Sequence, residues 1–135
     1  MTSGAEAVPV SKARQWTGWI LTVIAAIFLI FDGATKVLLV PAVLAAMAPL
    51  GYPVSLTRDI GILLLVCTAI YLIPRTSVFG AIVLTGYLGG AIAAHVRIGS
   101  PLFSHILFGF YLGLMVWGGL WLRDRNLRAL LPLRR

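Results

Sequence analysis

The pattern of apolar and polar positions along the chain predicts four long apolar helices. Predominantly apolar runs are separated by short segments that contain proline, glycine or charged residues. A helix that crosses the hydrocarbon core of a bilayer needs about 20 predominantly apolar residues. We therefore predict an all-α membrane protein, a single bundle of four transmembrane helices over residues 16–40, 56–73, 77–96 and 102–122.

The segments outside the four runs differ in character. Residues 1–15 are polar and are predicted to form a disordered leader, and residues 123–135 a basic tail, both on the cytoplasmic side. Residues 41–55 are apolar but contain three prolines and Gly51, so they cannot form one continuous span. A short helix over residues 42–48, lying in the interface or re-entering the bundle, is the simplest interpretation.

The second predicted span is the shortest. Residues 60–73 offer only 14 uncharged positions before Pro74. The segment crosses the membrane if it begins near Leu56, with Arg58 and Asp59 at the interface and the Arg58 side chain extending toward the headgroups. A re-entrant segment is the alternative.

The composition supports the membrane assignment. Hydrophobic residues make up 60% of the 135 residues and charged residues 11%, whereas soluble domains have about 45–50% and about 25%. The net charge of +7 lies mainly at the chain ends, without a motif that stacks on bases or reads a groove, so we predict no nucleic-acid partner. The single cysteine, Cys67, allows no intrachain disulfide and is predicted to be a small buried hydrophobe.

The basic residues predict the orientation. With four spans, both ends and the turn at residues 73–76 lie on one side of the membrane. That side carries eight basic residues and the other side three (Lys36, Arg58 and Arg97). Because basic residues are enriched on the cytoplasmic side, both termini are predicted to be cytoplasmic. The eight are Lys12, Arg14, Arg75, Arg123, Arg125, Arg128, Arg134 and Arg135.

Charged residues interrupt the first apolar run at positions 32–36. Asp32 and Lys36 are four residues apart, so on a helix they share one face, with the acid on the N-terminal side, the better order for pairing. Either charge alone is costly in hydrocarbon, so such residues face a bundle interior, a wet cavity or the headgroups. We predict that the two side chains form an ion pair.

The predicted topology brings polar side chains from all four helices to the non-cytoplasmic end of the bundle. Three interpretations stay open: mutual neutralisation and anchoring at the interface, a polar mouth over an apolar cavity that binds a lipid-like molecule, and proton transfer chemistry. The cluster comprises Asp32, Lys36, Arg58, Asp59, Tyr87, His95, Arg97 and His105.

No catalytic or metal site is predicted within this cluster. His95 and His105 with Asp32 or Asp59 could ligate a metal, but a ten-residue gap across a turn is not a typical ligand spacing. No nucleophile motif, phosphate-binding loop or pair of haem-ligating histidines on facing helices is present. We therefore predict no resident cofactor.

Small residues recur every fourth position in the third and fourth spans, at Gly86 and Gly90 and at Gly109 and Gly113. In lipid, small residues at this spacing allow helix backbones to approach closely. We therefore predict that these four glycines lie at helix–helix contacts.

Several segments together resemble the DoxX-like family of small bacterial membrane proteins. In the first half these are Phe31-Asp32-Gly33 with Lys36 and Pro41, Leu50-Gly51-Tyr52-Pro53 and the turn Ile73-Pro74-Arg75. In the second half these are residues 86–91, 95–97, 99–103 and 117–124. The resemblance covers nearly the whole chain from Trp16.

The resemblance implies a four-helix bundle in the bacterial cytoplasmic (inner) membrane, and by match it assigns Asp32, Lys36, Tyr87, His95 and Arg97 to a pocket or core pair. The expected function is a non-enzymatic accessory or small hydrophobic-ligand-binding protein, with membrane lipid or an apolar molecule as partner. The alternative, implied by the family, is a subunit of a membrane redox complex that works with quinone and a redox partner protein. A homo-oligomer is compatible with either function.

Overall fold

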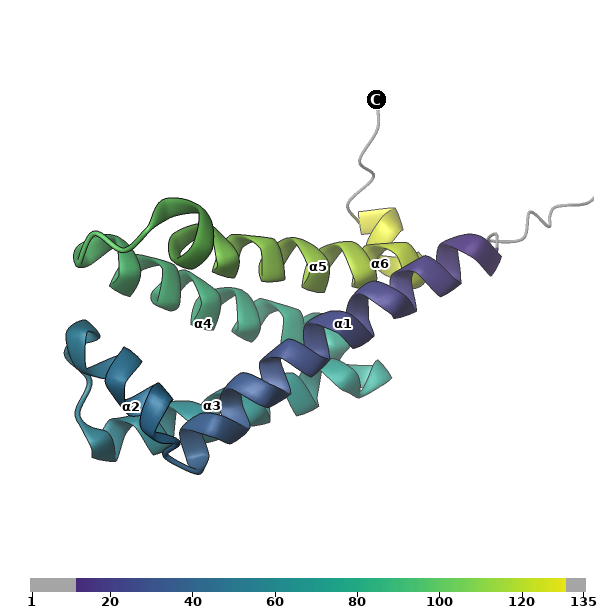
Figure 1. Cartoon of the computed structure of the whole chain (residues 1–135). Coiled ribbons are helices and arrows are strands. Elements are labelled where there is room, and N and C mark those ends of the chain that lie inside the picture. Colours follow the sequence, from purple (N-terminus) through teal and green to yellow (C-terminus); the bar gives the residue numbers. More distant parts are fainter. Residues whose placement is uncertain (1–11, 131–135) are drawn as a thin grey trace, which may run out of the picture.

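The computed structural model describes residues 12–130, in which four long helices alternate in direction and no β-strand occurs (Figure 1). The long helices are α1 (Lys12–Val37), α3 (Val54–Leu72), α4 (Ser77–Arg97) and α5 (Leu107–Arg123). Two short helices are α2 (Pro41–Met47) and α6 (Arg125–Leu130). Single turns of 3-10 helix, η1 (Ala48–Leu50) and η2 (Pro74–Thr76), precede α3 and α4, and a π-helical turn, η3 (Leu102–Ile106), precedes α5.

The first helix differs from its predicted bounds at both ends. It begins at Lys12, so residues 12–15 of the predicted disordered leader are helical, while residues 1–11 lie outside the described residues. It ends at Val37, three residues early, because Leu39 adopts a φ of +54°, which a right-handed helix excludes. In the predicted tail, residues 125–130 form α6 and residues 131–135 are again outside the described residues.

The second span is a continuous helix rather than a re-entrant segment. Helix α3 has 19 residues and, like the other three long helices, is long and apolar enough to cross a membrane. Pro53 ends the preceding turn in an extended conformation, and the Thr57 hydroxyl donates to the Pro53 carbonyl at 3.2 Å. The predicted short helix between the first two spans is also present, as α2 followed by η1.

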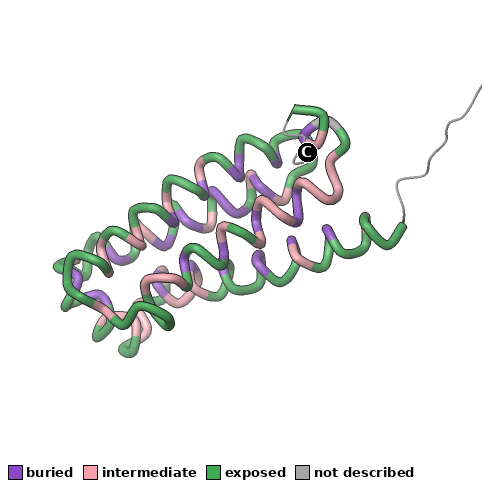
Figure 2. The backbone as a smooth tube through the Cα atoms, turned by 90° about the horizontal axis from the view of Figure 1, so that it is seen from above, coloured by how far each residue is buried: buried purple, intermediate pink, exposed green. Residues whose placement is uncertain are grey.

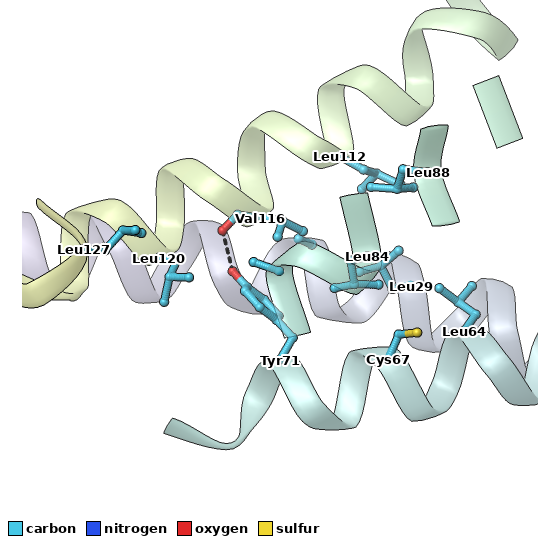
Figure 3. Close-up of a cluster of buried hydrophobic side chains, with 12 residues drawn as sticks. Leu29, Leu64, Cys67, Tyr71, Leu84, Leu88, Leu112, Val116, Leu120 and Leu127 are labelled. Carbon is cyan, nitrogen blue, oxygen red and sulfur yellow. Dashed lines mark hydrogen bonds between the residues drawn. The ribbon is translucent and has the colours of Figure 1, made fainter. Parts of the chain in front are cut away.

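The four long helices form a closed ring in which α1 packs on α3, α3 on α4, α4 on α5 and α5 on α1. Figure 2 shows the buried positions on the faces that the helices turn toward one another. Buried side chains from all four fill the centre, including Cys67, which is a buried hydrophobe as predicted (Figure 3). Tyr71 is fully buried there, and its hydroxyl donates to the Val116 carbonyl at 2.7 Å, which joins α3 to α5.

The two ends of the bundle are packed differently. We call the end with the start of α1 and α6 the terminal end, and the opposite end, with α2, the α2 end. At the terminal end, α1 and α5 touch through glycines, since a Cβ added to Gly119 would lie 2.8 Å from the Gly18 carbonyl oxygen. On the other side of the ring, a Cβ added to Gly80 of α4 would overlap the backbone of Tyr71 in α3.

At the α2 end the close approaches occur between other helices. An added Cβ at Gly33 of α1 would lie 3.2 Å from the Gly61 carbonyl oxygen of α3, and one at Gly109 of α5 would lie 2.9 Å from the Ile92 side chain of α4. The pair α1/α3 and the pair α4/α5 are therefore tight at this end, while the close glycine approaches that join one pair to the other lie at the terminal end. The two pairs diverge toward the α2 end (Figure 1).

The glycine prediction is correct for α5 and wrong for α4. Gly109 contacts Ile92, and Gly113 lies within van der Waals range of Leu88. An added Cβ at Gly86 or Gly90, in contrast, would meet no atom within 4 Å. Gly86 and Gly90 lie on the face of α4 that looks across the diverging pairs, so no helix backbone reaches them.

Candidate functional site

A cavity of about 690 Å³ occupies the space between the two helix pairs at the α2 end. Its walls come mainly from α1 and α4, with contributions from α2, η1, α3, η3 and α5. Gly86 and Gly90 both line it, and their lack of side chains adds to its width. The polar side chains that line the cavity are Asp32, Lys36, Tyr52, Tyr87, His95 and His105.

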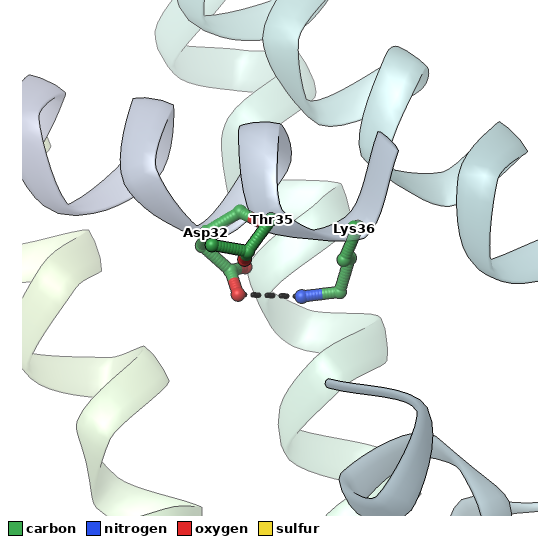
Figure 4. A network of polar contacts seen from close by, with 3 residues as sticks. All are labelled: Asp32, Thr35 and Lys36. Atoms are coloured by element: carbon green, nitrogen blue, oxygen red, sulfur yellow. Dashed lines mark hydrogen bonds and ion pairs between the residues drawn. The ribbon is translucent and has the colours of Figure 1, made fainter. Parts of the chain in front are cut away.

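Asp32 and Lys36 form the ion pair that their spacing predicts. The Lys36 ammonium donates to Asp32 Oδ1 at 2.5 Å, and both side chains leave the same face of α1 (Figure 4). The Lys36 stem packs over Gly61 of α3, so the lysine side chain is only 11% exposed, whereas the Asp32 side chain is 47% exposed. The carboxylate is thus the more accessible member of the pair.

The two histidines stand together on the opposite wall. His95 comes from the last turns of α4 and His105 from η3, and their ring centroids are 5.5 Å apart in an edge-to-face arrangement. A serine hydroxyl fixes each ring, because Nδ1 of His95 lies 2.9 Å from Ser100 Oγ and Nδ1 of His105 lies 2.7 Å from Ser104 Oγ. The Nε2 atom of each ring is the one that these serines do not bind.

The part of the cavity nearer the middle of the bundle is mostly apolar, with Tyr87 as a polar residue at this level of α4. Leu29, Leu88 and Leu112 line it from α1, α4 and α5. Phe28 and Phe108 meet across α1 and α5 with centroids 5.8 Å apart and an interplanar angle of 82°, the edge-to-face geometry that aromatic pairs prefer. The cavity therefore changes from polar at the α2 end to mostly apolar inside.

One side of the cavity mouth is closed by the connection between α1 and α3. Met47, Leu50 and Tyr52 line the cavity from this connection. The Arg97 guanidinium at the end of α4 donates to the Leu50 carbonyl at 2.7 Å and so ties the connection to the opposite helix pair. Gly51, with a φ of +88°, makes the turn that presents this carbonyl.

The comparisons with known proteins identify the family. The sequence model of the DoxX-like family matches residues 20–119. The chain belongs to the DoxX-like family. Comparison with curated proteins and with solved structures finds no match. Together with the four long apolar helices, the family match makes this DoxX-like protein a multi-pass integral membrane protein.

Three residues of the predicted polar cluster lie outside the cavity of the DoxX-like protein. Asp59 is exposed on α3, and Arg58 donates through Nε to the Val37 carbonyl at 3.1 Å. Arg58 thereby satisfies a carbonyl at the end of α1, a usual role for a basic side chain at a helix C-terminus. Arg97 supports the mouth rather than lining it. The other five members, Asp32, Lys36, Tyr87, His95 and His105, line the cavity together.

The sequence reasoning did not find the apolar walls of the cavity in this DoxX-like protein. Phe28, Phe108 and Met47 belong to apolar runs in which any position can face lipid, core or cavity. Tyr52 had a signal, since it is a polar aromatic residue between Gly51 and Pro53 in a segment that the topology places near the cluster.

Proposed function

We propose that this DoxX-like protein is a non-enzymatic binding protein that holds a small apolar or amphipathic molecule from the membrane in the α2-end cavity. The observation that carries the proposal is the cavity itself. Its volume of about 690 Å³ falls within the range of about 300–1,000 Å³ typical of small-molecule sites. Its lining is mostly apolar with a few convergent polar groups, the usual composition of such sites.

The state of the polar groups favours binding over turnover. The Asp32 carboxylate is engaged by Lys36, and both imidazoles are held by serines. The serines that hold the imidazoles, Ser100 and Ser104, are not among the described residues that line the cavity, and that lining contains no other serine, threonine or cysteine that could act as a nucleophile. Fixed polar groups at the edge of an apolar space orient a ligand, and this supports an accessory role.

Filling the cavity from Gly90 is expected to weaken binding strongly without disrupting the bundle. An added Cβ at Gly90 meets no atom within 4 Å, and the rest of a leucine side chain can extend into the cavity that Gly90 lines, so Gly90→Leu should fold. Overlap with a bound molecule costs about 1–3 kcal/mol, which weakens its affinity roughly 5- to 150-fold and lowers the occupancy accordingly. Native mass spectrometry of the protein, gently extracted from its membrane, measures the bound small molecule per chain.

The matched control is the neighbouring glycine on the same helix. Gly89 is equally open, but it is not among the cavity-lining residues. Gly89→Leu should keep the wild-type occupancy. Equal occupancy in the wild type and in Gly90→Leu would show that the molecule binds elsewhere, and a quinone as the retained molecule would favour the redox-subunit alternative.

We infer further that both chain ends face the cytoplasm of a bacterial inner membrane. Six basic residues of the described part of the chain lie at the terminal end and three at the α2 end, an asymmetry that supports this orientation. The six are Lys12, Arg14, Arg75, Arg123, Arg125 and Arg128, and the three are Lys36, Arg58 and Arg97.

Labelling of introduced cysteines tests the orientation. In a Cys67→Ala background, a membrane-impermeant maleimide should label Ser55→Cys in intact spheroplasts and label Arg125→Cys only after permeabilisation. Both positions are exposed, one at each end of the bundle. Arg75→Cys should behave like Arg125→Cys, and the unmodified protein with its buried Cys67 should stay unlabelled. The reverse pattern would invert the topology.

A further inference from the structure

The α2-end cavity is lined by one positive and one negative side chain, which neutralise each other. Asp32 and Lys36 are hydrogen-bonded at 2.5 Å, and the remaining titratable groups in its described lining are two tyrosines and two histidines. Phenols and imidazoles supply hydrogen-bond donors and acceptors. The cavity therefore combines one internally paired charge with additional hydrogen-bonding groups.

This balance determines which head group the cavity can hold. A charged head group loses its hydration on entry and needs a counter-charge of its own. Lys36 is already paired with Asp32, so the carboxylate of a ligand would find no unpaired cation in the cavity lining. The ammonium of a ligand would have to compete with Lys36 for the Asp32 carboxylate. An uncharged hydroxyl or carbonyl needs only a hydrogen-bond partner, which the second oxygen of Asp32 or the Nε2 atom of His95 or His105 can supply.

The order of polar and apolar groups gives the bound molecule a direction. On α1, Lys36 is nearest the α2 end, Asp32 lies one turn inside it, and Leu29 lies about one turn inside Asp32. On the opposite wall, Leu88 and Leu112 are about two turns inside His95 and His105. A molecule with one polar end therefore satisfies both parts of the cavity when that end lies among the polar residues and its hydrocarbon extends toward the leucines.

We propose that the occupant of the cavity is an uncharged amphiphile, with a hydroxyl or carbonyl head group beside Asp32 and the two histidines and an apolar tail that packs against Leu29, Leu88 and Leu112. This proposal rests on the proposed function, that the cavity is a binding site, and adds the chemical class and orientation of the ligand. The neutral Asp32–Lys36 pair is the element that selects against charged head groups.

Three probes with the same hydrocarbon chain test the selection: dodecanol, dodecanoate and dodecylamine. Binding is measured at about pH 8, where a carboxylic acid is ionised and an alkylamine is protonated, to the full chain in phosphatidylcholine nanodiscs. Nanodiscs with Gly90→Leu serve as the blank for partitioning into lipid. Dodecanol should bind at least about tenfold more tightly than either charged probe, a difference of about 1.4 kcal/mol. A charged probe that binds as tightly as dodecanol would overturn the proposal.

Changing the pair should change the preferred head group. Asp32→Asn leaves Lys36 without its partner, so this variant should prefer dodecanoate. Lys36→Met leaves the Asp32 carboxylate alone, so this variant should prefer dodecylamine. Because a lower folded fraction reduces the binding of all three probes alike, the preference within one variant stays informative even if the variant is less stable. Wild-type preference in both variants would mean that the pair does not select the ligand.

Charge changes outside the cavity provide the controls. Asp59→Asn removes a carboxylate from an exposed position of α3, and Arg75→Met removes a cation at the terminal end. Neither variant should alter the preference for dodecanol. If none of the three probes binds the wild type more than it binds Gly90→Leu, the proposed function fails; if they bind without the expected order, only the ligand class fails.

Discussion

Replacing Gly80 with alanine is expected to destabilise the bundle by at least about 2 kcal/mol. The new Cβ would overlap the backbone N and Cα atoms of Tyr71, which cannot rotate away as a side chain could. Overpacking costs about 1–3 kcal/mol and sometimes more, and a clash with backbone atoms belongs at or above the upper end of this range. Alanine recovers at most about 1 kcal/mol through its higher helix propensity, which leaves a loss of about 2 kcal/mol or more. The α3–α4 contact that holds the two helix pairs together must therefore move apart.

The measurement is reversible thermal or denaturant unfolding in a mild detergent, followed by circular dichroism. Gly89→Ala is the matched control, because the same methyl group on the same helix meets no atom within 4 Å. That variant should unfold at the wild-type temperature or slightly above it. A Gly80→Ala protein as stable as Gly89→Ala would show that α3 and α4 do not meet at this position.

The positions of the glycine contacts also explain why the bundle contains a cavity. The close backbone approaches between the pairs, at Gly119 with Gly18 and at Gly80 with Tyr71, lie at the terminal end, whereas the contact of Gly33 with Gly61 tightens one pair at the α2 end. Four helices joined in this way can touch at one end and separate at the other. The space at the open end is then available to a ligand, and the polar side chains at its edge orient that ligand.

Much of the fold was predictable because its cause is local. An apolar run of sufficient length predicts a span whatever its neighbours, and the four spans and the short helix after Pro41 were found in this way. The start of the first helix was missed because residues 12–15 are polar, and polarity was taken as a sign of disorder. Polar residues at the end of a membrane helix can continue it into water.

The site was predictable where its geometry lies within one helix or follows from the level of a residue in the bundle, as for the residues of α1, α4 and η3 that line the cavity together. The Asp32–Lys36 pair follows from a spacing of four residues. The predicted helix contact of Gly86 and Gly90 was wrong. Their spacing shows which face of the helix carries small residues, but it does not show whether another helix packs against that face. Arg58 was assigned to the cluster for a similar reason: its level in the membrane was predicted, but its bond to the Val37 carbonyl depends on how α1 and α3 pack.

Asp32→Asn is expected to destabilise the protein by about 2–3 kcal/mol, more than any other single change to the polar lining. The loss leaves the ammonium of Lys36, a side chain only 11% exposed, without its partner. Breaking a fully buried pair costs about 3–5 kcal/mol, and the half-exposed carboxylate makes this pair weaker. Lys36→Met should cost less, about 1 kcal/mol or below, because methionine keeps most of the apolar stem over Gly61 and the remaining Asp32 can be hydrated.

The double variant Asp32→Asn with Lys36→Met separates a pair from two independent side chains. If the residues act as a pair, removing Lys36 also removes the unpartnered charge that Asp32→Asn creates. The double variant should then be at least about 1 kcal/mol more stable than the sum of the single losses predicts. The same unfolding assay measures all four proteins, with Asp59→Asn as the control for losing an exposed carboxylate on α3. Losses that simply add would mean that Lys36 gains nothing from Asp32, and the cavity would then contain an independent cation able to attract an anionic ligand.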